Sequence, residues 1–322
     1  MSFIRTVLGD IAPDQLGRCG AHEHLIIDPS YTTERFPDFL LDSVEAGIEE
    51  LRAFRAAGGG AMVDSMPCDC GRNVVKLAAI SQATGVHILC PTGLHLRQYY
   101  PTGSWAERLG VERLADLFVA DLEMGIDAND YAGPVCERTS HRAGLIKIAS
   151  GLDRINDHEA RIFAAAGLAH LRTGAPILTH TEKGTAALEQ VACLQRHGVA
   201  PRHVVLSHTD RKPDVGYHRE ILSTGVFVEY DAHFRWKPEE GNPTADLILA
   251  LCSDGFASQI MLGMDAARRT YWKSYGGGPG HNYLQTTFRD LLLSRGLAPA
   301  DYDRFQLDNP RRAYQFRPPP QP

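Results

Sequence analysis

Histidine and aspartate residues stand where short apolar runs of this sequence end. His22 and His24 occupy alternate positions of one run, so on a strand both imidazoles point to one side and Glu23 points away. Each such residue taken singly is more often structural than catalytic, but imidazole and carboxylate groups together suit Zn²⁺ or a similar divalent ion. Three further apolar runs end at His180, His208 and Asp265.

Lys147 lies inside another apolar run, with Leu145 and Ala149 as its neighbours on the same face. An unpaired ammonium buried there would be costly, so the group must pair with an acid, lose its proton or be modified. A neutral lysine reacts with CO₂ to give a carbamate, an anionic oxygen ligand that can bridge two metal ions. The alternatives are a Schiff-base lysine and a salt-bridged structural lysine.

Runs of strand length separated by stretches of helical period would position these residues. One stretch repeats apolar side chains every three or four residues, from Leu41 to Phe54, and predicts a helix with one apolar stripe. Several runs are apolar on both faces, as parallel strands covered by helices are. The predicted strands are Gly20–Ile27, Ala61–Ser65, His87–Thr92, Gly144–Ala149, Pro176–His180, His203–His208, Gly225–Asp231 and Gln259–Asp265.

This alternation fits a closed (β/α)₈ barrel or an open doubly wound sheet. No Gly-x-Gly-x-x-Gly or Walker loop follows the first run, which weakens the nucleotide-binding sheet. In a barrel all strand ends meet at one mouth, where distant polar residues converge, so we predict the barrel. With no internal linker, residues 1–322 should form one domain with a loose Pro-rich tail over 316–322.

Composition argues against several other classes of protein. A hydrophobic fraction of 43%, a charged fraction of 22% and a net charge of −6 fit a globular protein without a nucleic-acid-binding face. Met1–Pro13 lacks a secretory signal and no run of about 18 apolar residues could span a membrane, so we predict a cytoplasmic protein. The seven cysteines fit reduced thiols, and Cys68-x-Cys70 is interpreted as an ordinary loop because no second pair accompanies it.

The order His22-x-His24, Lys147, His180, His208 and Asp265 resembles the phosphotriesterase-like group of the amidohydrolase superfamily, from about Gly17 to Pro310. The resemblance implies a homodimer in which each barrel holds two divalent ions, expected to be zinc, with manganese, cobalt or iron as alternatives. His22, His24 and Asp265 would hold the more buried ion, and His180 and His208 the more exposed one. Carbamylated Lys147 and a hydroxide would bridge them. The lead-in Gly17-Arg-Cys-Gly-Ala21 departs from the family pattern, which leaves the ligands unaffected but the substrate open.

The implied reaction is hydrolysis, in which the hydroxide attacks a carbonyl and Asp265 takes the released proton. The loops after the last two strands suggest which small molecule is the substrate. In barrel enzymes these loops often bind a phosphate group. Lys237 as a point charge, Arg268 as a fork and Tyr271 as a hydroxyl donor suit a phosphate dianion. They resemble the loops of phosphotriesterase-like lactonases that act on phosphorylated sugar lactones, and we predict such a substrate.

Several alternatives stay open. The same site could cleave a phosphotriester, a carboxylic ester or an N-acyl amide, and the barrel could instead be a Schiff-base lyase or a metal-binding protein without turnover. The loop cations could be solvated or pair with Glu239 and Glu240. Tyr99 and Tyr100 could reach the substrate or simply pack. Gly276–Gly278 could be a flexible lid or a tight path past the ligand.

Overall fold

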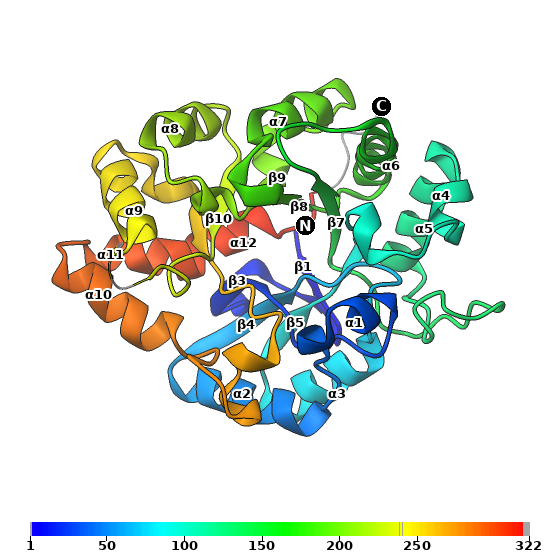
Figure 1. Ribbon diagram of the computed structural model, residues 1–322, viewed down its shortest axis with the longest axis horizontal. Helices are drawn as coiled ribbons and strands as arrows, with labels where there is room; N and C mark the ends of the chain where they lie inside the picture. The colour runs from blue at the N-terminus through cyan, green and yellow to red at the C-terminus, as the bar shows by residue number, and fades with distance from the viewer. Residues whose placement is uncertain (1, 238, 240, 318–322) are drawn as a thin grey trace.

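A computed structural model describes residues 2–237, 239 and 241–317 of the chain. Figure 1 shows strands at the centre and helices arranged around them. The parallel strands form a six-stranded sheet in the order β11-β10-β9-β8-β7-β6 and a three-stranded sheet in the order β3-β4-β5. The strand bounds are β3 Arg18–Glu23, β4 Gly59–Asp64, β5 His87–Leu89, β6 Pro91–Gly93, β7 Leu145–Ser150, β8 Ile177–Thr181, β9 Val204–Ser207, β10 Phe227–Tyr230 and β11 Ile260–Leu262.

The two sheets join into a closed barrel. β5 and β6 are separated only by Cys90 and share one barrel position. On the other side, the backbone N–H groups of Met264 and Asp265 donate to the carbonyl oxygen of His22 at 3.1 and 2.9 Å, which seals the end of β11 against β3. The predicted (β/α)₈ barrel is therefore confirmed.

The bounds of all the predicted strands shift, and two of the runs also differ from the observed strands in their course. In the run Gly20–Ile27, the strand ends at Glu23. The N–H groups of Leu25 and Ile26 donate to the Asp64 carboxylate at 2.7 and 3.3 Å, so they are not available to a neighbouring strand. The run from His87 divides at Cys90, before Pro91, which has no N–H to donate.

Helices cover the outside of the barrel. α6 shows why they form where they do: the Asn156 side chain caps its start by accepting from the Glu159 N–H, and Gly174 ends it at a φ of 74°. None of the helices in the described ranges is both long and apolar enough to cross a bilayer. The bounds are α1 Tyr31–Arg35, α2 Val44–Ala56, α3 Val74–Thr84, α4 Trp105–Arg108, α5 Val111–Glu123, α6 Asp157–Thr173, α7 Ala187–Arg196, α8 Val215–Ser223, α9 Pro243–Ser253, α10 Arg289–Ser294, α11 Pro299–Asp303 and α12 Asn309–Ala313.

Inward positions of the strands change from apolar to polar along the barrel. On β7, Leu145 belongs to the interior apolar cluster and Lys147, two residues later, is buried above it. On β10, Phe227 and Glu229 repeat this arrangement. The amino-terminal half of the interior is thus a packed core, and the carboxyl-terminal half is free to carry chemistry. The other strand residues of the interior cluster are Cys19, Ala21, Ala61, Val63, Leu89, Leu178, Val205 and Met261.

The first and last segments of the described chain meet near the amino-terminal end of the barrel. The hairpin of β1, Ile4–Thr6, and β2, Gly9–Ile11, contributes to the interior cluster, as does Tyr314 after α12. The sequence predicts a loose tail from residue 316, but Phe316 stacks on Phe3 at 4.7 Å and is 2% exposed. The Arg317 N–H also donates to the Gly174 carbonyl. Aromatic burial therefore moves the start of any tail to residues 318–322, which lie outside the described residues.

A buried histidine should make the stability of this fold depend on pH. The Nε2–H of His218 donates to the carbonyl oxygens of Thr209 and Lys212 at 3.0 and 3.1 Å, and its Nδ1 accepts from the Tyr230 hydroxyl at 2.7 Å. Burial lowers the pKa of His218 to about 4, although the two carbonyls raise it. In the unfolded chain the histidine has a pKa of about 6.5, so it is protonated there first as the pH falls.

His218 therefore contributes to the free energy of unfolding above about pH 6.5. This contribution, on the order of 3 kcal/mol, is lost as the pH falls towards 4. We expect urea unfolding of the metal-free protein to show lower stability at about pH 5 than at about pH 7.5. The His218→Gln variant should lose less stability over the same interval. Equal losses in the two proteins would contradict this assignment.

Candidate metal centre

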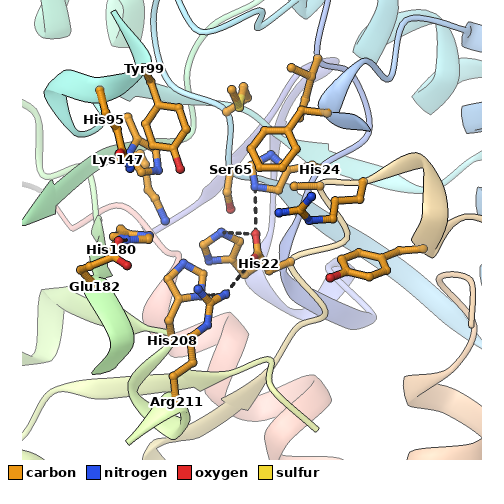
Figure 2. A pocket seen from close by; sticks show the side chains of 18 of the residues that line it. His22, His24, Ser65, His95, Tyr99, Lys147, His180, Glu182, His208 and Arg211 are labelled. Carbon is orange, nitrogen blue, oxygen red and sulfur yellow. Dashed lines mark hydrogen bonds and ion pairs between the residues drawn. The ribbon is translucent and has the colours of Figure 1, made fainter. Parts of the chain in front are cut away.

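The carboxyl ends of the strands open into a cavity of about 420 Å³. Figure 2 shows the imidazoles of His22, His180 and His208 and the amine of Lys147 directed towards one another across it. The structure therefore brings together residues that are far apart in sequence. All six residues predicted as metal ligands line the cavity: His22, His24, Lys147, His180, His208 and Asp265.

A β-bulge in β3 directs its two histidines. Because Ala21 already packs in the barrel interior, strict alternation would turn His22 outwards. The register between β3 and β4 shifts between Gly20 and Glu23, and the extra residue turns His22 back towards the axis. The predicted spacing of His22 and His24 therefore works only with this bulge. Glu23 lies away from the cavity and accepts from the Met264 N–H at 3.0 Å.

The four imidazoles form one cluster. Ring centroids of His22 and His208 lie 4.6 Å apart, those of His180 and His208 lie 4.7 Å apart, and those of His22 and His24 lie 5.7 Å apart. Donor atoms of His22, His24 and Asp265 lie within 4.8 Å of one another. This is the arrangement that ligands of a cation require.

Hydrogen bonds determine which ring nitrogen each histidine offers. The Nδ1 of His208 is hydrogen-bonded to the Asp231 carboxylate, which leaves Nε2 facing the cavity. The Nε2 of His180 lies 3.1 Å from Oε2 of Glu182, so this ring offers Nδ1 instead. Carboxylate partners of this kind fix the tautomer and orientation of metal-binding histidines.

His22 is held by a third carboxyl group that the sequence analysis did not identify. Its Nδ1 lies 2.9 Å from the Ser207 hydroxyl and 3.5 Å from Oε2 of Glu229. Glu229 is fully buried, and burial raises the pKa of its carboxyl group well above the ordinary value. It could have been found from sequence, because it shares the inward face of its strand with Asp231, two residues on.

His22, His180 and His208 are neutral at physiological pH. Burial is the largest cause that lowers the pKa of His22, His180 and His208, the last to about 3. The charge of Lys147 lowers the pKa of His22 further, and that of Arg211 does the same for His208. Each ring therefore keeps a lone pair available for a cation.

Lys147 is 1% exposed, and its Nζ forms no hydrogen bond within the described part of the chain. Burial lowers the pKa of this amine to about 7, although the charges of Asp265 and Glu229 raise it. A substantial fraction of the amine is therefore neutral near pH 7, as carbamate formation requires. The unsatisfied amine beside the cluster of imidazoles fits a pair of divalent ions.

The two carboxylate oxygens of Asp265 have different partners. Oδ1 lies 3.2 Å from Nε2 of His24, whereas Oδ2 accepts from Arg211 at 2.6 Å and from Arg235 at 3.1 Å. Burial alone would raise the pKa of Asp265, but the His24 hydrogen bond and the two guanidinium charges outweigh it, and the pKa is well below the ordinary value. Asp265 is thus ionised, with Oδ1 available to a cation. The sequence analysis missed both arginines, although Arg211 follows the strand-end His208 by three residues.

The predicted phosphate-binding residues divide into two groups. Arg268 and Tyr271 line the cavity, and the Arg268 guanidinium lies 4.9 Å from the Phe39 ring and 3.6 Å from an Asp38 oxygen. Lys237 is exposed and does not belong to the cavity lining. Glu240, one of the acids suggested as its partner, lies outside the described residues.

The glycine run Gly276–Gly278 forms a tight turn. The N–H of Gly277 donates to the Trp272 carbonyl at 2.8 Å, and that of Gly278 donates to the Thr270 carbonyl at 3.0 Å. A Cβ at Gly277 would lie 2.2 Å from the Thr270 oxygen, so only glycine fits there. Of the two predicted roles, the structure favours a close backbone path, which holds the glycine run against the backbone on either side of Tyr271.

Tyr99 and Tyr100 lie on different sides of their loop. Tyr99 lines the cavity, its ring centroid 4.4 Å from that of His95. Tyr100 does not reach the cavity, because its hydroxyl accepts from the His95 N–H at 2.8 Å and donates to the Cys68 carbonyl at 3.1 Å. Tyr100 therefore holds the loop that presents His95. Cys68 and Cys70 are buried free thiols whose pKa burial raises, as an ordinary loop interpretation expects.

The chain is similar to known proteins in sequence and in structure. Residues 2–314 match the Phosphotriesterase family. A phospho-furanose lactonase of Mycoplasmopsis synoviae (strain 53) is 33% identical over 324 residues, covering 98% of this chain and 92% of the relative. The crystal structure of a lactonase from Listeria monocytogenes has a TM-score of 0.88 at 32% identity, covering 98% and 99% of the two chains. That of the phosphotriesterase homology protein from Escherichia coli, with phosphate in its active site, has a TM-score of 0.84 at 31% identity, covering 94% and 99%. This chain therefore belongs to the Phosphotriesterase family and is a metal-dependent hydrolase.

Proposed function

We propose that this protein is a lactonase that opens a phosphorylated sugar lactone with the help of two divalent ions, expected to be zinc. The observation that carries the proposal is that one cavity contains both the cluster of candidate metal ligands and Arg268 and Tyr271, which suit a phosphate. The names of the relatives support it, since one is a phospho-furanose lactonase and another contains phosphate in its active site.

His22, His24 and Asp265 would hold one ion, and His180 and His208 the other, with a carbamate on Lys147 between them. When bound, such ions polarise the lactone carbonyl and make a water molecule nucleophilic at neutral pH. The buried amine of Lys147, without a hydrogen-bond partner in the described ranges, supports the carbamate. We also propose that the protein is cytoplasmic and, from the family resemblance, that it forms a homodimer.

Asp265 is proposed to take the proton that is released as water attacks, and to pass it to the ring oxygen of the opening lactone. Arg211 and Arg235 keep this carboxylate ionised and therefore able to accept a proton. They also lower its basicity, so proton transfer should require the hydrogen bond between Arg211 and Oδ2 to lengthen.

Removal of the phosphate contacts should affect phosphorylated substrates selectively. For Arg268→Ala, kcat/KM for phosphorylated lactones is expected to fall by about 30-fold, which corresponds to roughly 2 kcal/mol for a lost charged contact. Rates with unphosphorylated lactones should change little. Lys273→Ala is a matched control, because this lysine lies in the same loop but its Nζ donates to Asn282.

Lys237→Ala tests separately whether the exposed Lys237 reaches the phosphate of a bound substrate. If neither Lys237→Ala nor Arg268→Ala changes kcat/KM for any phosphorylated lactone, the proposed substrate class is wrong. A panel that also contains a phosphotriester, a carboxylic ester and an N-acyl amide identifies the bond that is cleaved. Trapping of substrate on Lys147 by borohydride would indicate a Schiff-base lyase instead.

A further inference from the structure

A polar wall of the cavity, formed by His95, Tyr99 and Glu182, has no part in the proposed reaction. Figure 2 shows these three side chains grouped around His180 and Lys147. Glu182 begins a single 3₁₀ turn, Glu182–Gly184, directly after β8, so its position is set by the strand that carries His180. The side chain of Glu182 is 32% exposed and lines the cavity.

Glu182 offers a hydrogen-bond acceptor to the cavity. Its Oε2 is engaged by Nε2 of His180 at 3.1 Å. Within the described residues, its Oε1 forms no hydrogen bond. A carboxylate oxygen is a strong acceptor for a hydroxyl group, and a hydrogen bond to a charged acceptor is stronger than one between neutral groups.

His95 offers a donor next to this acceptor. The Nδ1 of His95 accepts from the Leu96 N–H at 2.7 Å, so the hydrogen of a neutral ring must lie on Nε2. The His95 ring lies 4.9 Å from that of His180, between centroids, and lines the same cavity. A donor and an acceptor are therefore carried by two residues that each contact His180 and line the same cavity, and a hydroxyl group needs one partner of each kind.

We propose that Glu182 and His95 bind the hydroxyl group on the carbon next to the lactone carbonyl, and so make the enzyme selective for α-hydroxylated sugar lactones. This inference rests on the proposed function, in which the carbonyl is activated beside His180. The adjacent carbon then lies close to the residues that flank this histidine. The hydroxyl group donates to Oε1 of Glu182 and accepts from the Nε2–H of His95.

A lactone without this hydroxyl group would cover Glu182 and displace water without replacing its hydrogen bond. Sites built to bind a substrate hydroxyl reject analogues that lack it, because a buried polar group is left unpaired. Since Glu182 is partly exposed, the discrimination should be smaller than the roughly 10⁴- to 10⁵-fold of fully enclosed sites, and about 100-fold in kcat/KM is expected.

Glu182 also orients His180, and this second effect must be separated from substrate selection. A residue that only positions His180 would change metal binding and lower the rates for all lactones by one factor. A residue that binds the hydroxyl group changes the ratio of kcat/KM between a lactone and its α-deoxy counterpart. This ratio is the decisive readout.

The experiment uses the metal-loaded enzyme, a phosphorylated γ-lactone of an aldonic acid and the same lactone without the α-hydroxyl group. Wild type should prefer the hydroxylated lactone by roughly 100-fold, and Glu182→Leu should reduce this preference to a few-fold. Glu182→Gln, whose amide keeps one acceptor oxygen and places a donor NH₂ at the other position, should retain part of it. His95→Phe should also reduce the preference, with unchanged metal content.

Glu189→Leu, a substitution of an exposed glutamate on α7, is the control and should leave the ratio at the wild-type value. If Glu182→Leu lowers both rates equally, or changes neither, the inference is overturned while the lactonase assignment stands. If wild type hydrolyses no lactone at all, the proposed function fails and the inference fails with it.

Discussion

Lys147→Met is expected to lose lactone hydrolysis by roughly 10³-fold or more and to bind less metal than wild type. Methionine fills a similar volume in the barrel but supplies no anionic ligand. Without a bridging carbamate, the two ions lose a shared negative ligand, and several kcal/mol of transition-state stabilisation are lost with them. The measurements are metal content per chain by elemental analysis and kcat/KM after incubation with excess metal.

Two comparisons make this result specific to the carbamate. Reconstitution of metal-free wild type should require bicarbonate, whereas that of Lys147→Glu, which carries a permanent carboxylate, should not. Lys183→Met replaces an exposed lysine near the mouth and should behave as wild type. Full metal content and an unchanged rate in Lys147→Met would contradict the bridging role.

The barrel could be predicted from sequence because parallel strands covered by helices leave a simple signal. Lys147 stands out as a charge inside an apolar run, and His180 and His208 stand out as polar ends of such runs. The barrel topology then brings these ends to one mouth whatever the loop lengths are. The cluster of candidate ligands follows from strand order alone.

Local irregularities were not predictable in this way. The bulge that directs His22 depends on how β3 pairs with β4, which no pattern within one strand reveals. Tyr99 and Tyr100 are sequence neighbours of the same type, and only the hydrogen bonds of Tyr100 to Cys68 and His95 show which one is structural.

The partners of the candidate ligands were missed for a related reason. Arg211, Arg235 and Glu182 lie on loops after different strands, and their contacts with Asp265 and His180 are set by loop conformation. A charged residue two or three positions after a ligand is a usable signal, but the same pattern is common among solvated loop residues.

Asp265→Asn is expected to lower kcat by about 10³-fold, because the variant has no carboxylate to accept the released proton. It should also weaken metal binding. The amide cannot balance the charges of Arg211 and Arg235, which lie 2.6 and 3.1 Å from Oδ2 in the native protein. The two guanidinium groups, which also pair with Asp231 at 3.0 and 2.8 Å, would then share this one carboxylate, and their excess positive charge would repel the nearby ions. The measurements are kcat and the metal dissociation constant from chelator competition.

A specific non-additive effect is expected at the same site. In Asp265→Asn, Arg211 and Arg235 share only the Asp231 carboxylate. The further substitution Arg211→Met removes the excess positive charge and should restore part of the metal affinity, with a coupling of about 2 kcal/mol. Arg211→Met alone should weaken metal binding little, because Asp265 stays ionised next to Arg235.

As a control, Asp254 and Arg219 form an exposed ion pair at 2.7 Å, and their substitutions should couple by less than about 1 kcal/mol. Additive effects of Asp265→Asn and Arg211→Met would show that Arg211 only packs beside the metal centre. Coupling would show that Asp265 balances the charge of Arg211 and that this charge acts on the bound ions.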